Sequence, residues 1–217
     1  MDNPNINHIA NPNLTNGNVK KTNMGASKPK MDAVIEQLIQ KAETFDSFLD
    51  ANSYLDGVKQ NNPNMVKLDE NEYKYKDYYI NTGIKFIIDP HVKGLKTANK
   101  LNLSCAPTLV DYITTKNEKN YVLITRLEGT ENGNVVPYNE CRQDVTLEAK
   151  NKFLNDVDRF IGIGYTNKAI ESPKNWFVVP STKRIVIGNW SEFVSLGSEE
   201  NKAHYRKDIA DMLGLVY

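Results

Sequence analysis

From Met65 to Leu127 the sequence consists of short apolar stretches, rich in Tyr, Ile, Val and Phe, that are separated by polar turns. Runs of β-branched and aromatic residues bounded by turn residues favour strands. The predicted strands are MVKL, YKYKDYYI, GIKFIID, TLVDYI and YVLITRL, the last two joined by the polar turn TTKNEKN. Between the third and fourth, HVKGLKTANKLNL is predicted to be a short helix that Gly94 weakens.

Amphipathic helices are predicted on either side of this strand-rich part. In residues 31–55 apolar side chains recur at steps of three or four, at Val34, Leu38, Ala42, Phe45 and Leu49, and Gly57 with QNNPN is expected to end the pattern. After the flexible connector EGTENGN, helices are predicted in TLEAKNKFLNDVDRFIGIG and EENKAHYRKDIADMLGL, with the hairpin NWFVV–PSTK–RIVIGNW between them. A strand-rich front half and a helix-rich back half predict an α+β fold with two lobes.

Composition excludes several classes of function. Lys plus Arg and Asp plus Glu are equal, at 27 each, so no net charge favours nucleic acid or an anionic membrane. No apolar run approaches the roughly 20 residues of a membrane span. Two cysteines and three scattered histidines fit neither a disulfide framework nor a zinc site. They favour a reducing, intracellular compartment.

The first 30 residues are rich in Asn, Pro, Gly and Ser and poor in large apolar residues, which predicts a disordered tail before a single domain at 31–217. The stretch lacks the pattern of an ordinary secretory signal. It is interpreted either as a loose tail, the favoured reading, or as a leader for a specialised secretion system that delivers the protein into a host cell.

The order of these elements from Tyr54 to Leu215 resembles the protein-kinase-like fold in a very short form. GIKFI is similar to the third strand of the small lobe, so Lys85 matches the phosphate-contacting lysine. APTLVDYI and NYVLITRLEG are similar to the next two strands and the hinge, which places Glu128 and Gly129 where adenine would bind. The resemblance implies an N-terminal helix and small lobe at 31–127, a hinge at 128–134 and a reduced large lobe at 135–217.

Two further segments carry the resemblance into the second half. SPKNWFVV is similar to the end of the catalytic loop, so Asn175 matches the metal-binding Asn. RIVIGNW is similar to the strand before the Asp-Phe-Gly motif and puts Asn189 at the metal-binding Asp, followed by Trp190 and Ser191. ATP and Mg²⁺ are therefore the implied cofactors. The small size resembles compact bacterial effector kinases.

Several residues depart from the kinase pattern. Ile170 occupies the position of the catalytic Asp, and Glu171, one place later, is a weak substitute. Asn189 is neutral where a carboxylate would hold Mg²⁺. The phosphate-covering glycine loop is missing apart from Gly57, and residues 91–103 contain no carboxylate to pair with Lys85. ATP and Mg²⁺ are therefore expected to bind weakly or not at all.

Each candidate residue also has a structural interpretation. Lys85 could be a solvated lysine at a strand edge, and Asn175 could bond its own backbone in a turn. Asn189 with Trp190 could be a turn residue beside a core aromatic. LDENEYKYKD is interpreted as a solvated strand edge, since it lacks the spacing of a calcium loop.

The favoured function is a kinase-like protein that has lost standard phosphotransfer and binds a protein partner, as a secreted effector in one version of the hypothesis. Two alternatives stay open. One is an active, atypical ATP-dependent Ser/Thr-type protein kinase effector that uses Lys85, Glu171, Asn175 and Asn189. The other is an interaction protein without kinase ancestry.

Overall fold

The structure is a computed structural model that describes residues 31–117 and 119–215. The tail predicted to be disordered lies outside these residues. Contacts group the chain from Ala33 onward into one compact unit. The fold is mixed, with helices and antiparallel sheets. In the part of the chain that is described, no helix is both long and apolar enough to cross a membrane. The division into lobes at 128–134 stays a prediction.

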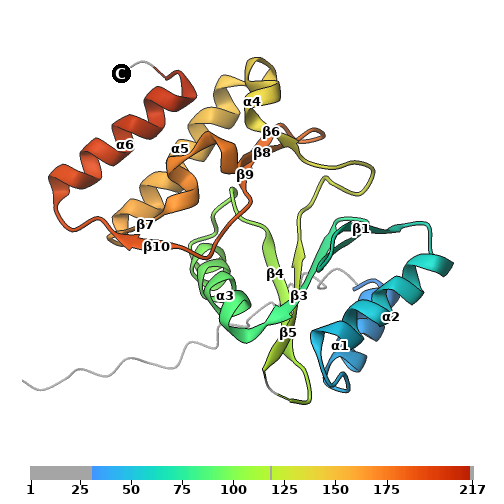
Figure 1. The fold of residues 1–217 in the computed structure, drawn as a ribbon. Coiled ribbons are helices and arrows are strands. Elements are labelled where there is room, and N and C mark those ends of the chain that lie inside the picture. Colours follow the sequence, from blue (N-terminus) through green and yellow to red (C-terminus); the bar gives the residue numbers. More distant parts are fainter. Residues whose placement is uncertain (1–30, 118, 216–217) are drawn as a thin grey trace, which may run out of the picture. The chain divides into compact units, whose positions relative to one another are not determined.

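An antiparallel five-stranded sheet is built from the strand-rich part of the sequence. Its strands are β1 (Met65–Asp69), β2 (Glu72–Tyr75), β3 (Tyr78–Ile84), β4 (Thr108–Thr114) and β5 (Asn120–Arg126). They lie in the order β1-β2-β3-β5-β4 (Figure 1). Strands predicted from MVKL, TLVDYI and YVLITRL are confirmed. YKYKDYYI, predicted as one strand, instead covers the end of β2, a turn at Lys76 and Asp77 and the start of β3, because Lys76 has φ +55° and reverses the chain.

The first predicted helix is in fact two helices, α1 (Ala33–Ala42) and α2 (Phe48–Asn61). Ser47 caps α2, accepting a hydrogen bond from the Asp50 backbone N–H at 3.3 Å while the Asp50 carboxylate accepts one from the Ser47 N–H at 2.9 Å. This reciprocal capping box starts a new helix within the apolar pattern that was predicted to form one helix over residues 31–55. Leu49 is consequently exposed, and α2 runs through Gly57, where the pattern was expected to end.

The predicted strand GIKFIID is wrong. Strand β3 ends at Ile84 and helix α3 (Lys85–Lys100) begins at the next residue. A short apolar run does not distinguish strand from helix by periodicity. The structure selects the helix, in which Ile88, Val92 and Leu95 share one buried side. Helix α3 packs on one face of the five-stranded sheet, and α1 and α2 lie on the other (Figure 1).

The second half contains the predicted helices α5 (Leu147–Gly162) and α6 (Glu199–Leu213) and the predicted hairpin of β8 (Trp176–Val179) and β9 (Arg184–Ile187). Strand β6 (Val136–Pro137) adds to this hairpin, giving a three-stranded sheet. The remaining elements are α4 (Tyr138–Cys141), β7 (Tyr165–Asn167), β10 (Phe193–Ser195) and the 3-10 turns η1 (Arg142–Asp144), η2 (Lys168–Glu171) and η3 (Pro173–Asn175).

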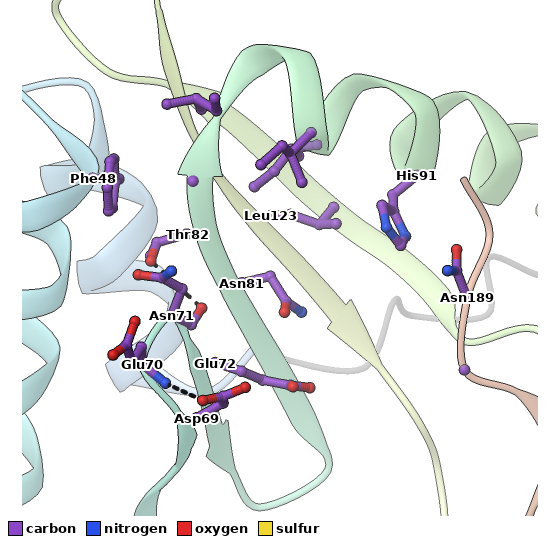
Figure 2. Close-up of a pocket in the computed structure, with 15 residues that line it drawn as sticks. Phe48, Asp69, Glu70, Asn71, Glu72, Asn81, Thr82, His91, Leu123 and Asn189 are labelled. Atoms are coloured by element: carbon purple, nitrogen blue, oxygen red, sulfur yellow. Dashed lines mark hydrogen bonds between the residues drawn. The ribbon is translucent and has the colours of Figure 1, made fainter. Parts of the chain in front are cut away.

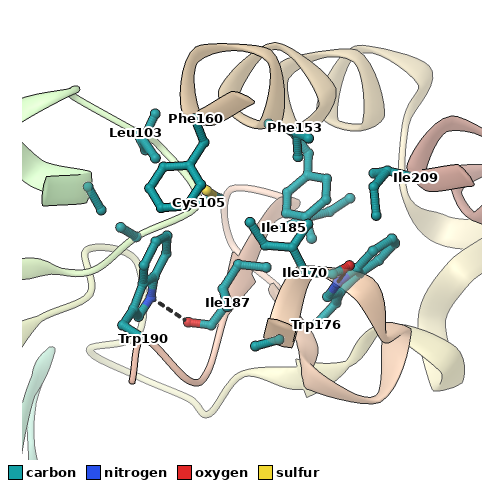
Figure 3. Packing of buried hydrophobic residues seen from close by; sticks show 14 of the residues in the cluster. Leu103, Cys105, Phe153, Phe160, Ile170, Trp176, Ile185, Ile187, Trp190 and Ile209 are labelled. Atoms are coloured by element: carbon teal, nitrogen blue, oxygen red, sulfur yellow. Dashed lines mark hydrogen bonds between the residues drawn. The ribbon is translucent and has the colours of Figure 1, made fainter. Parts of the chain in front are cut away.

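One large hydrophobic core joins α3 and the loop after it to the second half. Figure 3 labels Leu103 and Cys105 of that loop among residues of the second half. Trp176 of the hairpin packs against Phe153 of α5 with ring centroids 4.9 Å apart, and Trp190 meets Phe160 at 6.2 Å. Buried Asp156 of α5 accepts hydrogen bonds from the Ser104 Oγ at 2.6 Å and from the Cys105 backbone N–H at 2.8 Å. The loop after α3 is therefore tied to α5 by a buried carboxylate.

Candidate functional site

Strands β8 and β9 bring Asn175 and Asn189 to the same end of their hairpin. Trp176 pairs with Ile187, and the Gly188 backbone N–H donates to the Asn175 carbonyl oxygen at 3.1 Å. These two asparagines are the ones that the kinase resemblance assigns to a metal. Antiparallel pairing of the two strands explains why they lie near each other, and their assignment to a metal stays a prediction.

The side chain of Asn189 is occupied by its own turn. Its Oδ1 accepts hydrogen bonds from the Ser191 backbone N–H at 2.8 Å and from the Ser191 hydroxyl at 2.6 Å. This is the self-bonding turn that short amide side chains favour. Trp190, between them, is buried and donates from Nε1 to the Ile187 carbonyl oxygen at 3.1 Å. Across 31–117 and 119–215, no group of three or more His, Cys, Asp and Glu side chains is placed to hold a metal ion.

Ile170, which the kinase resemblance puts at the position of the catalytic aspartate, lies in the core. Ile170 is only 1% exposed, and its carbonyl oxygen accepts a hydrogen bond from the Trp176 Nε1 at 3.0 Å. Glu171, the weak catalytic candidate, is the last residue of the 3-10 turn η2 and is exposed. Neighbouring positions on this turn therefore point one side chain into the core and the other into solvent.

Lys85 is the first residue of α3 and not a residue of strand β3. Its side chain is exposed, and its ammonium nitrogen lies 5.6 Å from the centroid of the Tyr121 ring, within cation–π range. Its backbone N–H donates to the carbonyl oxygen of Lys119 at 2.8 Å. The lysine is thus held at the junction of β3 and α3, where its side chain meets β5.

The backbone of the connector after β5 is bonded to the chain's own side chains. Four consecutive carbonyl oxygens, from Leu127 to Thr130, accept hydrogen bonds; we call them the connector carbonyls. Their donors are Thr130 Oγ1 to Leu127 at 2.7 Å, Arg184 Nη2 to Glu128 at 3.4 Å, Ser181 Oγ to Gly129 at 2.6 Å and Lys74 Nζ to Thr130 at 2.6 Å. Gly129 has φ +92°, and an added Cβ would lie 2.6 Å from the Ser181 Oγ.

The buried ammonium group of Lys74 was not anticipated from the sequence. Its Nζ donates to the carbonyl oxygens of Thr130 and Gly133, each at 2.6 Å. Desolvation by burial lowers the pKa of Lys74, an effect that the nearby carboxylates of Glu131 and Asp77 oppose. The segment LDENEYKYKD is therefore not simply a solvated strand edge, because β2 turns a lysine inward to bind the connector.

A cavity of about 590 Å³ opens beside the sheet, on the face of β2 that carries Glu72 and Lys74 (Figure 2). One row of paired residues, Glu72 of β2, Asn81 of β3 and Leu123 of β5, crosses the sheet and lines it. His91 of α3 and Asn189 also line the cavity. Of the residues predicted to form the site, Asn189 reaches the cavity, whereas Lys85, Glu128, Gly129, Glu171 and Asn175 are not in its lining.

The charged groups of the cavity are acidic. Asp69, Glu70 and Glu72 line it, and none of the described lining residues is a lysine or an arginine. Burial, and secondly the negative charge of Asp69, raise the pKa of Glu72. Burial lowers the pKa of His91 and so favours its neutral form. With amide groups beside the carboxylates, the cavity is suited to a cationic or hydrogen-bonding group and unsuited to phosphates.

Glu72, Asn81 and His91 were missed by sequence reasoning. The alternation in β2 contained part of the signal, because Glu72 and Lys74 share one face of the strand. Whether that face lines the cavity depends on the pairing of β2 with β3 and of β3 with β5. His91 gave no signal by itself, since it lies in a segment whose helix was predicted too short.

The known proteins that this chain resembles include two kinases of known structure. No protein-family model matches the sequence, and no curated protein does. The PK-1 kinase of Cydia pomonella granulovirus is similar in structure at 13% identity and a TM-score of 0.41, over 67% of this chain and 58% of that one. Vaccinia related kinase 3 is similar at 12% identity and a TM-score of 0.36, over 61% and 47%. The chain thus spans less than two thirds of either kinase, and TM-scores this low do not establish a shared fold.

Proposed function

We propose that this chain is a kinase-like domain that does not carry out standard phosphotransfer and that acts by binding a protein partner. The kinase-like part is supported by the order of its elements. Three antiparallel strands, a helix, two more strands, a connector, a helix and a hairpin follow one another, as the resemblance implies. The two-lobed division and the likeness to compact bacterial effectors belong to this proposal.

The observation that carries the loss of phosphotransfer is the bonding of the connector carbonyls. The resemblance puts adenine beside Glu128 and Gly129, and the adenine amino group needs an acceptor such as a carbonyl oxygen. Here each of the four carbonyls already accepts a hydrogen bond from a side chain. Adenine would have to share these carbonyl oxygens with donors already in place, one of them the buried ammonium group of Lys74, so the connector offers it only their remaining lone pairs.

The cavity gives independent support. A triphosphate would bring several negative charges to a surface lined by Asp69, Glu70 and Glu72. Mg²⁺ could neutralise a phosphate, but the residue at the metal-binding position is Asn189, whose side-chain oxygen already accepts two hydrogen bonds. ATP with Mg²⁺ therefore fits these residues poorly.

Partner binding is supported by apolar side chains that the fold leaves in solvent. Phe86 of α3 is 86% exposed and Ile87 is 59% exposed, although both are among the most apolar side chains. A large exposed aromatic group beside a cavity is typical of a surface that is covered by another molecule.

Nucleotide binding tests this proposal directly. We expect no thermal shift with ATP, with or without Mg²⁺, at concentrations up to the millimolar range. A ligand present at 100 times its dissociation constant would add about 2.7 kcal/mol, which is readily measured. A known ATP-binding kinase measured beside it provides the positive control.

Transfer of labelled phosphate from ATP separates the atypical kinase from the non-catalytic domain. The native chain and Lys85→Ala should both leave themselves and a generic protein substrate unlabelled. Labelling by the native chain that Lys85→Ala abolishes, with the fold verified by circular dichroism, would favour the atypical kinase instead. Such a result would defeat the proposal.

A further inference from the structure

The beginning of α3 carries three exposed apolar side chains that the fold does not use. Ile84 is 43% exposed, beside the more exposed Phe86 and Ile87. We call these three residues the apolar rim. The contact of α3 with the core is made by other side chains, such as Ile88 and Val92. The apolar rim is therefore not needed to hold the helix on the sheet.

The apolar rim is continuous with the cavity. Ile84 and Ile87 are part of the cavity lining, together with Glu72 and Asn81 from the sheet. Phe86 lies between the two isoleucines in sequence, at the same end of α3. A molecule that packs on Ile84 and Ile87 would therefore also meet the carboxylate and amide groups of the cavity, of which Figure 2 labels Glu72 and Asn81.

The charge of this surface selects the class of molecule that covers it. Three carboxylates line the cavity. The pKa of Glu72 is raised by burial and by Asp69, whereas a cation in contact with it would lower that pKa. Lys85 is the nearest cation in sequence to the rim, but its ammonium nitrogen lies over Tyr121 and it is not in the cavity lining. The surface thus combines apolar side chains with negative charge.

We propose that the apolar rim and the cavity together dock a segment of a protein partner that presents an arginine or lysine beside an aromatic or aliphatic side chain. The apolar side chain packs on Phe86 and Ile87. The basic group enters the cavity and donates hydrogen bonds to the carboxylate of Glu72 and the amide oxygen of Asn81. This inference rests on the partner-binding part of the proposed function and specifies the chemistry of the partner.

The test uses random 12-residue peptides displayed on phage and selected on the full chain. Enriched peptides are then synthesised with a fluorescent label, and their affinity is measured by anisotropy. The binding variants are Phe86→Ser and Glu72→Gln. The matched controls are Leu147→Ser, at a residue 66% exposed on α5, and Glu148→Gln, exposed on the same helix. Circular dichroism and thermal unfolding verify that each variant folds.

Enriched peptides are expected to carry arginine or lysine next to aromatic or aliphatic residues. Phe86→Ser and Glu72→Gln should each weaken their binding at least about tenfold, as expected for central contacts of an interface. The two control variants should bind within about twofold of the native chain, inside the range of ordinary surface substitutions. Added salt should weaken binding to the native chain more than binding to Glu72→Gln.

Three results would overturn the docking surface. Peptides without basic residues, peptides insensitive to Phe86→Ser and Glu72→Gln, or no enrichment above the starting library would each do so. If the peptides bind elsewhere, partner binding survives and only this surface is rejected, whereas phosphate transfer by the native chain would reject the proposed function itself. Light scattering measures the oligomeric state. A native dimer that becomes a monomer in Phe86→Ser would show that a second copy of the chain, not a partner peptide, covers the apolar rim.

Discussion

The ammonium group of Lys74 donates a buried hydrogen bond to the carbonyl oxygen of Thr130, at 2.6 Å, across 56 residues of sequence. This bond connects strand β2 to the connector at Thr130, directly after Glu128 and Gly129, beside which the kinase resemblance puts adenine. Hydrogen bonds from charged donors are among the stronger ones in proteins, and buried carbonyl groups need such partners. The same bond therefore stabilises the connector and occupies one acceptor position of the Thr130 carbonyl oxygen.

Lys74→Met should lower the free energy of unfolding by about 1 to 3 kcal/mol. The change keeps the length of the side chain but removes the ammonium donor of the Thr130 and Gly133 carbonyl oxygens, leaving Thr130 only the long bond from the Gly133 backbone N–H at 3.4 Å. Urea unfolding measures the effect. Lys93→Met, at an exposed position of α3, is the matched control and should change stability by less than about 0.5 kcal/mol. Equal effects of the two changes would contradict the role given to Lys74.

Gly129→Ala should destabilise the chain by about 1 to 3 kcal/mol. Its φ of +92° disfavours any side chain, and the new Cβ would lie 2.6 Å from the Ser181 hydroxyl oxygen that bonds the connector. Gly133→Ala in the same connector is the control, because an added Cβ there meets nothing within 4 Å. Chemical denaturation gives the free energy of unfolding of both variants. If Gly129→Ala is as stable as the native chain, the connector accepts a side chain at this position and the prediction is wrong.

Glycines in two helices should respond in opposite directions to alanine. At Gly94 of α3 an added Cβ would collide with the Trp190 carbonyl oxygen and lie 2.5 Å from the Phe193 ring, so we expect a loss of about 1 to 3 kcal/mol or more. At Gly57 of α2 nothing lies within 4 Å, and alanine should add up to about 1 kcal/mol. Thermal and urea unfolding distinguish these outcomes. A stabilising Gly94→Ala would mean that α3 does not pack closely on the Trp190 segment.

Ile170→Asp, which restores the acid of the kinase pattern, should destabilise the protein by about 3 to 5 kcal/mol. Ile170 is 1% exposed, so the new carboxylate would be buried in the core. Ile170→Val removes one methylene group and should cost only about 0.5 to 1.5 kcal/mol. Unfolding midpoints test this. A stable Ile170→Asp that gains phosphotransfer would show that the core opens at this position.

His91 should make stability depend on pH. Burial lowers its pKa below the ordinary value of 6.5, so the unfolded chain takes up a proton more readily. Stability is therefore lost as the pH falls below about 6.5 toward the folded pKa. Urea unfolding at pH 7.5 and 5.5 should show a larger loss in the native chain than in His91→Gln. Glu72 has a raised pKa, so it contributes stability as the pH falls and opposes the effect of His91. If His91→Gln loses as much stability as the native chain, groups other than His91 cause the pH dependence.

Much of the local structure could be predicted from the sequence because it depends on neighbours in the chain. Periodic spacing of apolar residues predicted α5 and α6, and two apolar runs joined by a polar turn predicted the β8–β9 hairpin. Where a pattern admitted two readings the prediction was wrong, as for GIKFIID, whose apolar residues fit a strand or a helix.

The candidate site could not be predicted in the same way. Its cavity depends on the register that sets Glu72 opposite Asn81 and Asn81 opposite Leu123, and on the docking of α3 beside that row. A shift of one residue in the register would turn these side chains to the other face. The functional assignments of Lys85, Glu128, Gly129, Glu171 and Asn175 stay predictions, now with known positions in the fold.

The sequence by itself determined which residue types were available: Ile170 and Asn189 at positions where the kinase resemblance has acids, and a row of apolar residues near Lys85. It also determined most strands and helices, because hydrophobic periodicity acts over a few residues. Only the tertiary structure decided that Lys74 reaches the connector and that three carboxylates line one cavity. Such contacts join residues far apart in sequence, and burial in the folded core gives them their strength, since a hydrogen bond away from water does not compete with solvent.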